Sequence, residues 1–363
     1  MTSSHAEESG KVKPHIWFKL TYSLVSMSVT RKPKEPITVS LPNDQQIIFW
    51  MRTFPEEKQI QPQLCCSATA QHSMNEKLYS HFQKFAERLL PQDSTSQVSL
   101  PHRLSFDAEI DEHGKIPENW GVRLAIFPNN FQALHREMSS KLHTVVESYM
   151  KTLRWVQSAS GKQAALARVS FEYSFDKETW HSMPSNFNVS VHSPKAIELN
   201  KLKAVTELWT RNEFEPLAHE LLREAFDLLR SNQRSALLIG STALETGFKH
   251  FIDFLLPNAG MLLEKMPSPP PLTMIRDIIP EIQKKLAKPE FRLRKDELDL
   301  LQKWNTIRNK VAHGLPQKID NDALEEYLLF VQKLLYCLDQ QRGHSWASTF
   351  AEPLAEETRP NEG

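Results

Sequence analysis

The residues of this chain best suited to chemistry lie near its C-terminus, in the run Arg308-Asn309-Lys310-Val311-Ala312-His313. A histidine can give or take a proton near neutral pH, and the planar guanidinium of an arginine can hold the negative charge that develops on phosphoryl oxygens. With a neighbouring amide, these are the groups that metal-independent cleavage of an RNA phosphodiester requires. No other stretch of the sequence offers a comparable set.

This motif occupies the end of a predicted helix over residues 296 to 313, with Asp296 as the expected N-cap. The apolar side of that helix is Leu301, Trp304, Ile307 and Val311. Arg308 lies on this side, so we expect its charge to be paired or to face a wet cleft. Asn309 and His313 are four residues apart and share the adjoining face. Gly314 then ends the helix, where the helix dipole favours a cation.

Helices are also predicted around the motif helix, because apolar residues recur there at helical spacing. The predicted segments are 216–229, 233–256 and 322–338. The last of them is expected to begin at Asp322, with Glu325 completing a capping box. Four amphipathic helices of this length can bury one another in a bundle.

An insertion over residues 257–295 separates the helix 233–256 from the motif helix. It begins with a proline-rich run at 267–271, contains a short predicted helix over 273–287, and ends in a set of cations. These cations are Lys284, Lys285, Lys288, Arg292, Arg294 and Lys295. Only Glu290 opposes them within that stretch. They are expected either to contact RNA phosphates beside the motif or to form a solvated face.

The C-terminal part, residues 203–342, resembles the HEPN domains, which are all-helical bundles with an Arg, a short spacer and a His, often with Asn directly after the Arg. Arg308, Asn309 and His313 carry the resemblance. The Ala243-Leu244-Glu245 step adds to it, because such domains often have an acidic residue there. We expect Glu245 to pair with Arg308 within roughly 4 Å, the usual ion-pair distance.

The resemblance implies a homodimeric endoribonuclease that needs no metal and no cofactor and whose two motifs meet across the interface. One His313 would act as base on the ribose 2′-hydroxyl, and the partner subunit's His313 would act as acid on the leaving 5′-oxygen. Arg308 would stabilise the transition state, and Asn309 would orient the His or the phosphate. By family analogy, such an activity suits a toxin or an antiphage defence effector with a neutralising partner protein.

Two other interpretations stay open. A non-catalytic relative would use the bundle for dimerisation or for binding a nucleotide or a partner. Alternatively, the chain is a helical signalling module in which His313 is only a cap, since a His followed by Gly is a common helix stop.

The region before the bundle is predicted to be an α+β domain over residues 15–202, with a role in sensing a trigger or selecting a target. Strands are expected at 15–24, 46–52, 63–69, 104–110, 121–127, 167–175 and 187–191, and helices at 75–90 and 130–157. Residues 1–14 are expected to be loose, and residues 343–363 to form a flexible tail. The complete prediction is therefore a multi-domain chain, an α+β domain followed by an all-α HEPN-like bundle.

Composition narrows the remaining possibilities. The 44 basic and 44 acidic residues balance, so any RNA binding must be local. Cys65, Cys66 and Cys337 form neither a disulfide framework nor a metal knuckle, and they favour a reducing cytoplasm. No apolar run reaches the ~18 residues of a membrane span, so no membrane partner is expected.

Two further sets of residues are expected to be structural. His135, Glu137 and His143 share one predicted helix, but their spacing matches no helical zinc pair. Trp155, Trp180 and Trp209 are expected to serve in a core or at a domain junction.

Overall fold

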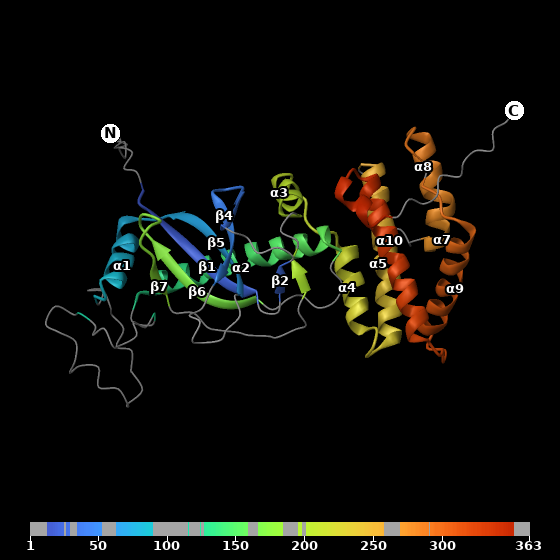
Figure 1. The fold of residues 1–363 in the computed structure, drawn as a ribbon, viewed down its shortest axis with the longest axis horizontal. Helices are drawn as coiled ribbons and strands as arrows, with labels where there is room; N and C mark the ends of the chain where they lie inside the picture. The colour runs from blue at the N-terminus through green and yellow to red at the C-terminus, as the bar shows by residue number, and fades with distance from the viewer. Residues whose placement is uncertain are drawn as a thin grey trace, which may run out of the picture. The chain divides into compact units, whose positions relative to one another are not determined.

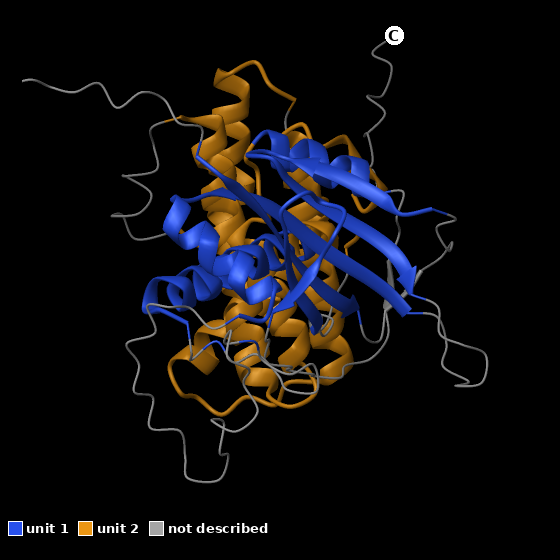
Figure 2. Ribbon diagram, turned by 90° about the vertical axis from the view of Figure 1, so that its left-hand side faces the viewer, with its two compact units in different colours: residues 1–150, 164–211 blue, residues 151–163, 212–363 orange. Residues whose placement is uncertain are grey.

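The computed structural model describes residues 13–24, 27–29, 35–52, 63–89, 115, 124, 127–158, 166–183, 195–197, 201–257, 269–289 and 291–351. The chain divides into two compact units, shown in separate colours in Figure 2. The sheet unit comprises residues 1–150 and 164–211, and the helical unit comprises residues 151–163 and 212–363. The expected layout, strands and helices first and helices afterwards, is therefore present.

The sheet unit is built on a six-stranded antiparallel sheet of order β3-β4-β5-β1-β6-β7 (Figure 1). Its strands are β1 (His15–Leu24), β3 (Ile37–Leu41), β4 (Gln45–Arg52), β5 (Gln63–Ser73), β6 (Leu166–Ser174) and β7 (His181–Met183). The strands β2 (Met27–Val29) and β8 (Lys195–Ile197) form a separate parallel pair. In β1, Ile16, Phe18 and Leu20 alternate with more exposed residues and are fully buried, which fixes the face that this strand turns to the core.

A cluster of aromatic side chains packs together in the core of the sheet unit. Helix α1 (Glu76–Ala86) places Phe82 5.5 Å from Phe18 of β1, measured between ring centroids. Helix α2 (Asn129–Val156) places Phe131 4.5 Å from the same Phe82 ring. Helix α3 (Leu202–Thr210) also belongs to this unit, whereas the sequence placed residues from 203 onward with the bundle.

Most of the predicted elements of the sheet unit that can be compared are confirmed. The strands near 46–52, 63–69 and 167–175 and the helices near 75–90 and 130–157 are present as β4, β5, β6, α1 and α2. The predicted strands 104–110 and 187–191 lie outside the described residues. Of 121–127 the structure describes residues 124 and 127, which lie in a helical turn and a bend and not in a strand.

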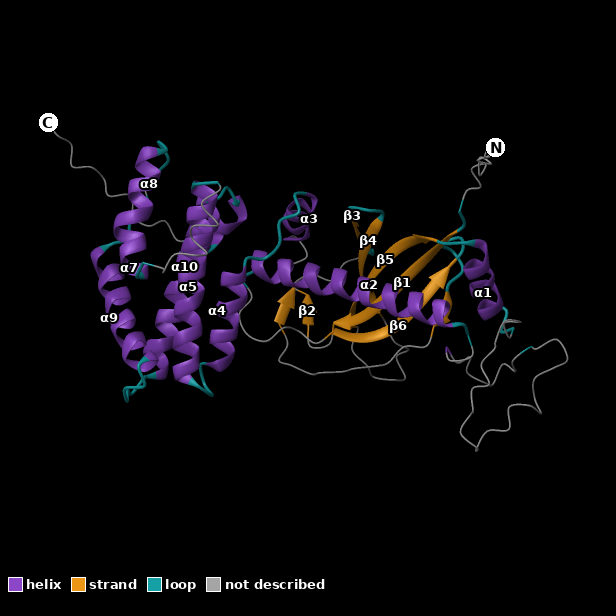
Figure 3. Cartoon of the chain, turned by 180° about the vertical axis from the view of Figure 1, so that it is seen from behind, coloured by secondary structure: helices purple, strands orange, loops and turns teal. Residues whose placement is uncertain are grey.

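The described part of the helical unit includes four long helices (Figure 3). They are α4 (Leu217–Leu228), α5 (Gln233–Leu255), α9 (Lys295–Ala312) and α10 (Asn321–Gln341). Between α5 and α9 lie α7 (Pro271–Thr273), the π-helical turn η5 (Met274–Ile278) and α8 (Ile279–Lys285), which follow one another without a break and correspond to the short helix expected over 273–287. Among the helices that the structure describes, none is both long and apolar enough to cross a membrane.

Two glycines of α5 allow its neighbours to approach closely. A Cβ at Gly240 would overlap Leu328 Cδ2 of α10 and lie 3.6 Å from Ala225 of α4. A Cβ at Gly247, one heptad later, would overlap Leu335 Cδ2 and lie 3.6 Å from Ala218. The heptad spacing of the two glycines matches that of the two leucines, so α5 meets α4 on one side and α10 on the other at two successive levels.

Three helix ends differ from the prediction. Helix α9 follows Arg294, whose backbone N–H donates to Glu297 Oε2 at 2.9 Å, so Glu297 and not Asp296 caps it. Helix α10 is capped by Asp320, which accepts from the Ala323 N–H, and not by Asp322. The expected tail from 343 onward is wrong up to residue 351, because a 3-10 turn, η6 (Ser345–Thr349), follows α10 and buries Ala347.

Candidate active site at the end of α9

Helix α9 ends as the sequence predicts, with His313 as its C-cap. Gly314 has φ of +72°, a conformation that glycine adopts without steric cost. Its N–H donates to Val311 O at 3.0 Å, and the Leu315 N–H donates to Lys310 O at 2.9 Å. This Schellman pattern stops the helix sharply and fixes the backbone that carries His313.

Arg308 and Glu245 form the ion pair that was predicted from the sequence. Arg308 Nη2 lies 3.3 Å from Glu245 Oε1, and Arg308 Nη1 donates to Asn309 Oδ1 at 3.2 Å. The side chains of Arg308 and Glu245 are 31% and 23% exposed, so the pair lies at the edge of the bundle within reach of solvent. A guanidinium held by two partners in this way has a fixed orientation.

A second polar layer lies one helical turn behind this ion pair. Trp304 of α9 stacks on Tyr327 of α10 with ring centroids 5.1 Å apart. The Tyr327 hydroxyl lies 3.3 Å from Ser241 Oγ, four residues before Glu245 on α5. Burial raises the pKa of Tyr327 to about 12, so this hydroxyl stays protonated at neutral pH. Within the described part of the chain, Arg308 Nε and Trp304 Nε1 are buried donors without an acceptor.

His313 is placed differently from Arg308 and Asn309. Its side chain is exposed, and no hydrogen bond or ion pair holds its imidazole among the described residues. The structure thus brings Arg308, Asn309 and Glu245 together through direct contacts and leaves His313 projecting from the helix end. One copy of the chain therefore has an Arg308 guanidinium fixed by two partners and a His313 imidazole that none of the described residues fixes.

The basic segment before α9 is less strongly positive than its sequence indicates. Lys284, Lys285, Lys288, Arg292, Arg294 and Lys295 are all exposed. However, Lys285 lies 3.4 Å from Glu281, and Arg294 lies within 3.4 Å of both Asp296 and Glu297. Lys288 is placed over the ring of Phe254, 4.7 Å from its centroid. The two lysines at 284 and 295 have no ion-pair partner among the described residues.

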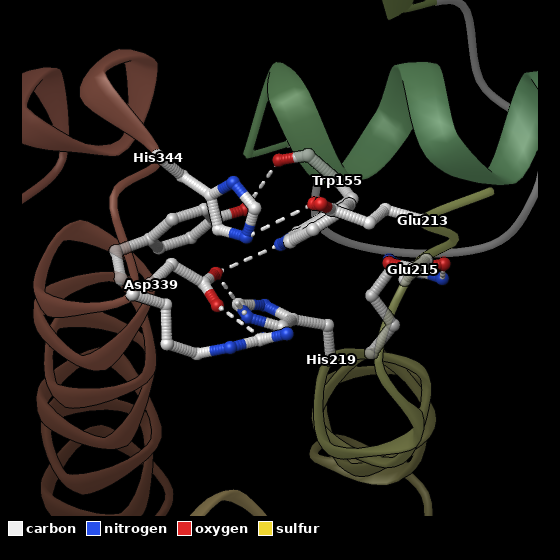
Figure 4. Close-up of polar contacts among 9 residues, drawn as sticks. Trp155, Glu213, Glu215, His219, Asp339 and His344 are labelled. Atoms are coloured by element: carbon white, nitrogen blue, oxygen red, sulfur yellow. Dashed lines mark hydrogen bonds and ion pairs between the residues drawn. The ribbon is translucent and has the colours of Figure 1, made fainter. Parts of the chain in front are cut away.

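A buried polar cluster elsewhere in the helical unit was missed by the sequence analysis. Asp339 of α10, His219 of α4 and Trp155 at the end of α2 meet there (Figure 4). Asp339 and His219 are 3% and 5% exposed. The signal in the sequence was a charged residue directly after the apolar positions Leu335 and Leu338, and a histidine beside Ala218 on the buried side of α4.

The residues that could have suggested a metal or an aromatic platform make packing and polar contacts with other side chains. His135 is buried with its ring centroid 5.0 Å from that of Phe171, whereas His143 Nδ1 lies 2.6 Å from the Tyr22 hydroxyl. No group of three or more metal-binding side chains occurs in the described ranges. Trp155 and Trp209 are buried, as expected, and Trp180 packs under the Lys19 ammonium at 4.0 Å.

The three cysteines are free and buried.

Comparison of the chain with models of known protein families, with curated proteins and with solved structures finds no significant match.

Proposed function

We propose that the chain is a metal-independent endoribonuclease of the HEPN type, with its active site at the end of α9. The observation that carries the proposal is the guanidinium of Arg308, which Glu245 and Asn309 hold at the bundle edge five residues before an exposed histidine. An ion pair that is this exposed to solvent contributes little to the stability of the fold. A held cation beside a free proton carrier is what in-line cleavage of a phosphodiester needs.

The chemistry is transesterification within the RNA. One His313 takes the proton of a ribose 2′-hydroxyl, and the 2′-oxygen attacks the adjacent phosphorus. The bond to the 5′-oxygen then breaks, and this oxygen takes a proton from the second His313, that of the partner subunit. Arg308 stabilises the charge on the non-bridging oxygens, and the products are a 2′,3′-cyclic phosphate and a 5′-hydroxyl.

The mechanism calls for two copies of the chain, because each copy has one His313 and the reaction needs a base and an acid. We infer a homodimer through the helical unit, with the two motifs facing each other. Mixing wild type with an equal amount of inactive His313→Ala protein would form some dimers that carry only one His313. These mixed dimers should be inactive, so cleavage per wild-type chain should fall if both motifs contribute to one site.

The test uses the full chain, a labelled single-stranded RNA and buffer containing EDTA. Cleavage should leave 5′-hydroxyl ends that polynucleotide kinase can label, and His313→Ala should abolish it with an unchanged melting temperature. Lys303→Gln, an exposed change on the same helix, is the matched control and should cleave normally. Cleavage that requires a divalent metal, or that persists in His313→Ala, would contradict the proposal.

A non-catalytic assembly or nucleotide-binding protein is the second candidate. It is favoured by the unheld imidazole of His313, since a general base is usually oriented by a neighbouring group. For this candidate the wild type would dimerise or bind nucleotide but leave RNA intact. A role as a toxin or an antiphage effector belongs to the first candidate alone, since only RNA cleavage would harm the cell.

A further inference from the structure

The last turn of α2 is attached to the helical unit by polar contacts that are themselves buried. Residues 129–150 of this helix belong to the sheet unit, whereas residues 151–156 belong to the helical unit. Trp155 is almost completely buried, and its indole is directed at Asp339 (Figure 4). A buried charge is costly unless it is fully hydrogen bonded, so the number of its donors matters.

Asp339 has three donors, one from α2, one from α4 and one from Arg342, the residue that caps the end of α10. Trp155 Nε1 donates to Asp339 Oδ2 at 2.9 Å, and His219 Nε2 donates to the same oxygen at 2.8 Å. Arg342 Nη1 donates to Oδ1 at 3.4 Å. Burial raises the pKa of the Asp339 carboxyl, but these three groups together outweigh burial and hold the pKa below its usual value. The side chain is therefore an ionised acceptor at neutral pH.

The backbone and the ring of Trp155 are held as well. The hydroxyl of Tyr336 donates to Trp155 O at 2.7 Å, a carbonyl at the helix end that also accepts from the Ser158 N–H at 3.1 Å. The indole lies edge-on to His344 and Trp346, with centroids 5.3 Å and 4.9 Å away. His344 in turn lies 3.7 Å from the carboxylate of Glu213.

These contacts depend on one another. If Trp155 leaves, Asp339 loses a donor while it stays buried beside His219, and Tyr336 loses its acceptor. A half-satisfied buried network is less stable than either a closed or a fully hydrated one, so partly open forms are disfavoured. The packing of α5 against α4 and α10 through Gly240 and Gly247 uses none of these groups and can persist without them.

We propose that Asp339, His219 and Tyr336 form a latch that holds residues 151–158 in the helical unit and releases them in one local opening step, with the four long helices still folded. The latch is a conformational device independent of RNA cleavage. Its opening detaches the end of α2 without unfolding the bundle.

Hydrogen–deuterium exchange of the full-length protein tests the latch. In Asp339→Asn, amides of residues 151–158 should exchange roughly ten- to a hundredfold faster, the effect of losing a hydrogen bond to a charged group. Amides of α5 should keep their wild-type rates. Asp322→Asn makes the same chemical change at an exposed position of the same helix and should alter neither segment.

Two milder variants keep the test decisive if Asp339→Asn does not fold. Tyr336→Phe removes only the hydroxyl that binds Trp155 O, and Trp155→Phe removes the indole donor but keeps an aromatic ring. Each should accelerate exchange in 151–158 by a smaller factor and leave α5 unchanged. Unchanged exchange in 151–158 in every folded variant, or acceleration shared equally by α5, would show that this segment opens only with the whole unit.

Discussion

Arg308 illustrates how one side chain can be read from sequence and then placed by structure. Its position on the apolar side of a helix demanded a partner, and Glu245 is that partner at 3.3 Å. Both side chains remain partly exposed, so solvent screens their attraction. The ion pair is therefore better suited to orient the guanidinium than to stabilise the fold.

Glu245→Gln tests this distinction. The glutamine keeps the shape of the side chain but removes its charge, so Arg308 loses its ion pair and gains freedom to rotate. We expect the free energy of unfolding to fall by less than about 1 kcal/mol, as for other partly exposed pairs. If Arg308 has the proposed role, RNA cleavage should fall about tenfold or more, because the orientation of its guanidinium is lost. A loss of stability of several kcal/mol with normal cleavage would reverse the assignment.

Asp339 leads to a prediction about acid stability. Its pKa in the folded protein is lowered from a value of about 3.9 in an unfolded chain. The ionised carboxylate therefore stabilises the fold above that pH, and the contribution is lost as the pH falls through the lower, folded-state pKa. In urea unfolding, wild type should exceed Asp339→Asn by about 3 kcal/mol at neutral pH, the cost of breaking a buried pair. Below about pH 4 the difference should shrink.

The groups that face Asp339 need a control in this measurement. His219 of α4, Arg342 of α10 and His250 of α5 all act on it electrostatically. Arginine stays charged throughout, whereas burial lowers the pKa of His250. The stabilities with and without Asp339→Asn should therefore also be compared in proteins that carry His219→Gln. This removes the contribution of His219, which is the largest of the three. A difference that grows as the pH falls would contradict a lowered pKa.

The residue scale also shows where sequence reasoning stops. The Arg308–Glu245 pair was accessible because both residues lie at defined positions on predicted helices. The contact of Trp155 with Asp339 could not be predicted, because 184 residues separate the two and the sequence around one does not identify the other as its partner. A charged residue within the buried side of α10 indicated that some partner exists but could not identify it.

At the scale of elements, α5 depends on the absence of two side chains. Gly247→Ala should raise helix propensity by about 1 kcal/mol but overpack the contact with Leu335, which typically costs about 1–3 kcal/mol. We expect a net loss of roughly 1 kcal/mol in the free energy of unfolding, since the methyl of Leu335 can shift in part. Thermal denaturation checks this, with Thr242→Ala, an exposed change on α5, as the control.

The double variant Gly247→Ala/Leu335→Val decides the cause. Removing a methylene from the facing residue should recover part of the lost stability if overlap is responsible. Additive losses in the double variant would mean that Gly247 matters for another reason.

The segment α8 and the residues after it carry a prediction for RNA binding. Lys284 has no ion-pair partner among the described residues, whereas Lys285 already pairs with Glu281. Lys284→Glu should therefore weaken RNA binding and reduce the slope of log affinity against log salt by about 1, as for one lost phosphate contact. Lys285→Glu, next to it in the chain, should have a smaller effect. Equal slopes for wild type and both variants would place the RNA elsewhere.

The long elements were predicted well because their periodicity extends over many residues. Helices α5, α9 and α10 and strands β1 and β6 follow from apolar spacing alone. Their ends were less accurate, because side chains from inside the helix can replace the expected cap. Glu297 does so for α9, and no local rule selects it over Asp296.

At the scale of the whole molecule, the helical unit is not one continuous piece of chain. It needs residues 151–163 in addition to 212–363. A fragment that begins at residue 203, the boundary expected from sequence, therefore lacks Trp155. We expect it to melt at a lower temperature than the helical unit of the full chain, and a peptide of residues 148–163 should restore part of the loss. A fragment as stable as the full chain would show that these contacts contribute nothing.

The separation of Trp155 from Asp339 also sets an order of events during synthesis on the ribosome. Trp155 leaves the exit tunnel long before α10 exists, since 184 residues must still be added before its acceptor is made. At about 5–20 residues per second, this interval lasts on the order of ten seconds or more. During that time a large aromatic side chain at a helix end has no burial site and is available to chaperones or to neighbouring nascent chains. Slow codons or pauses between residues 156 and 339 should therefore lower the yield of folded protein more than pauses elsewhere.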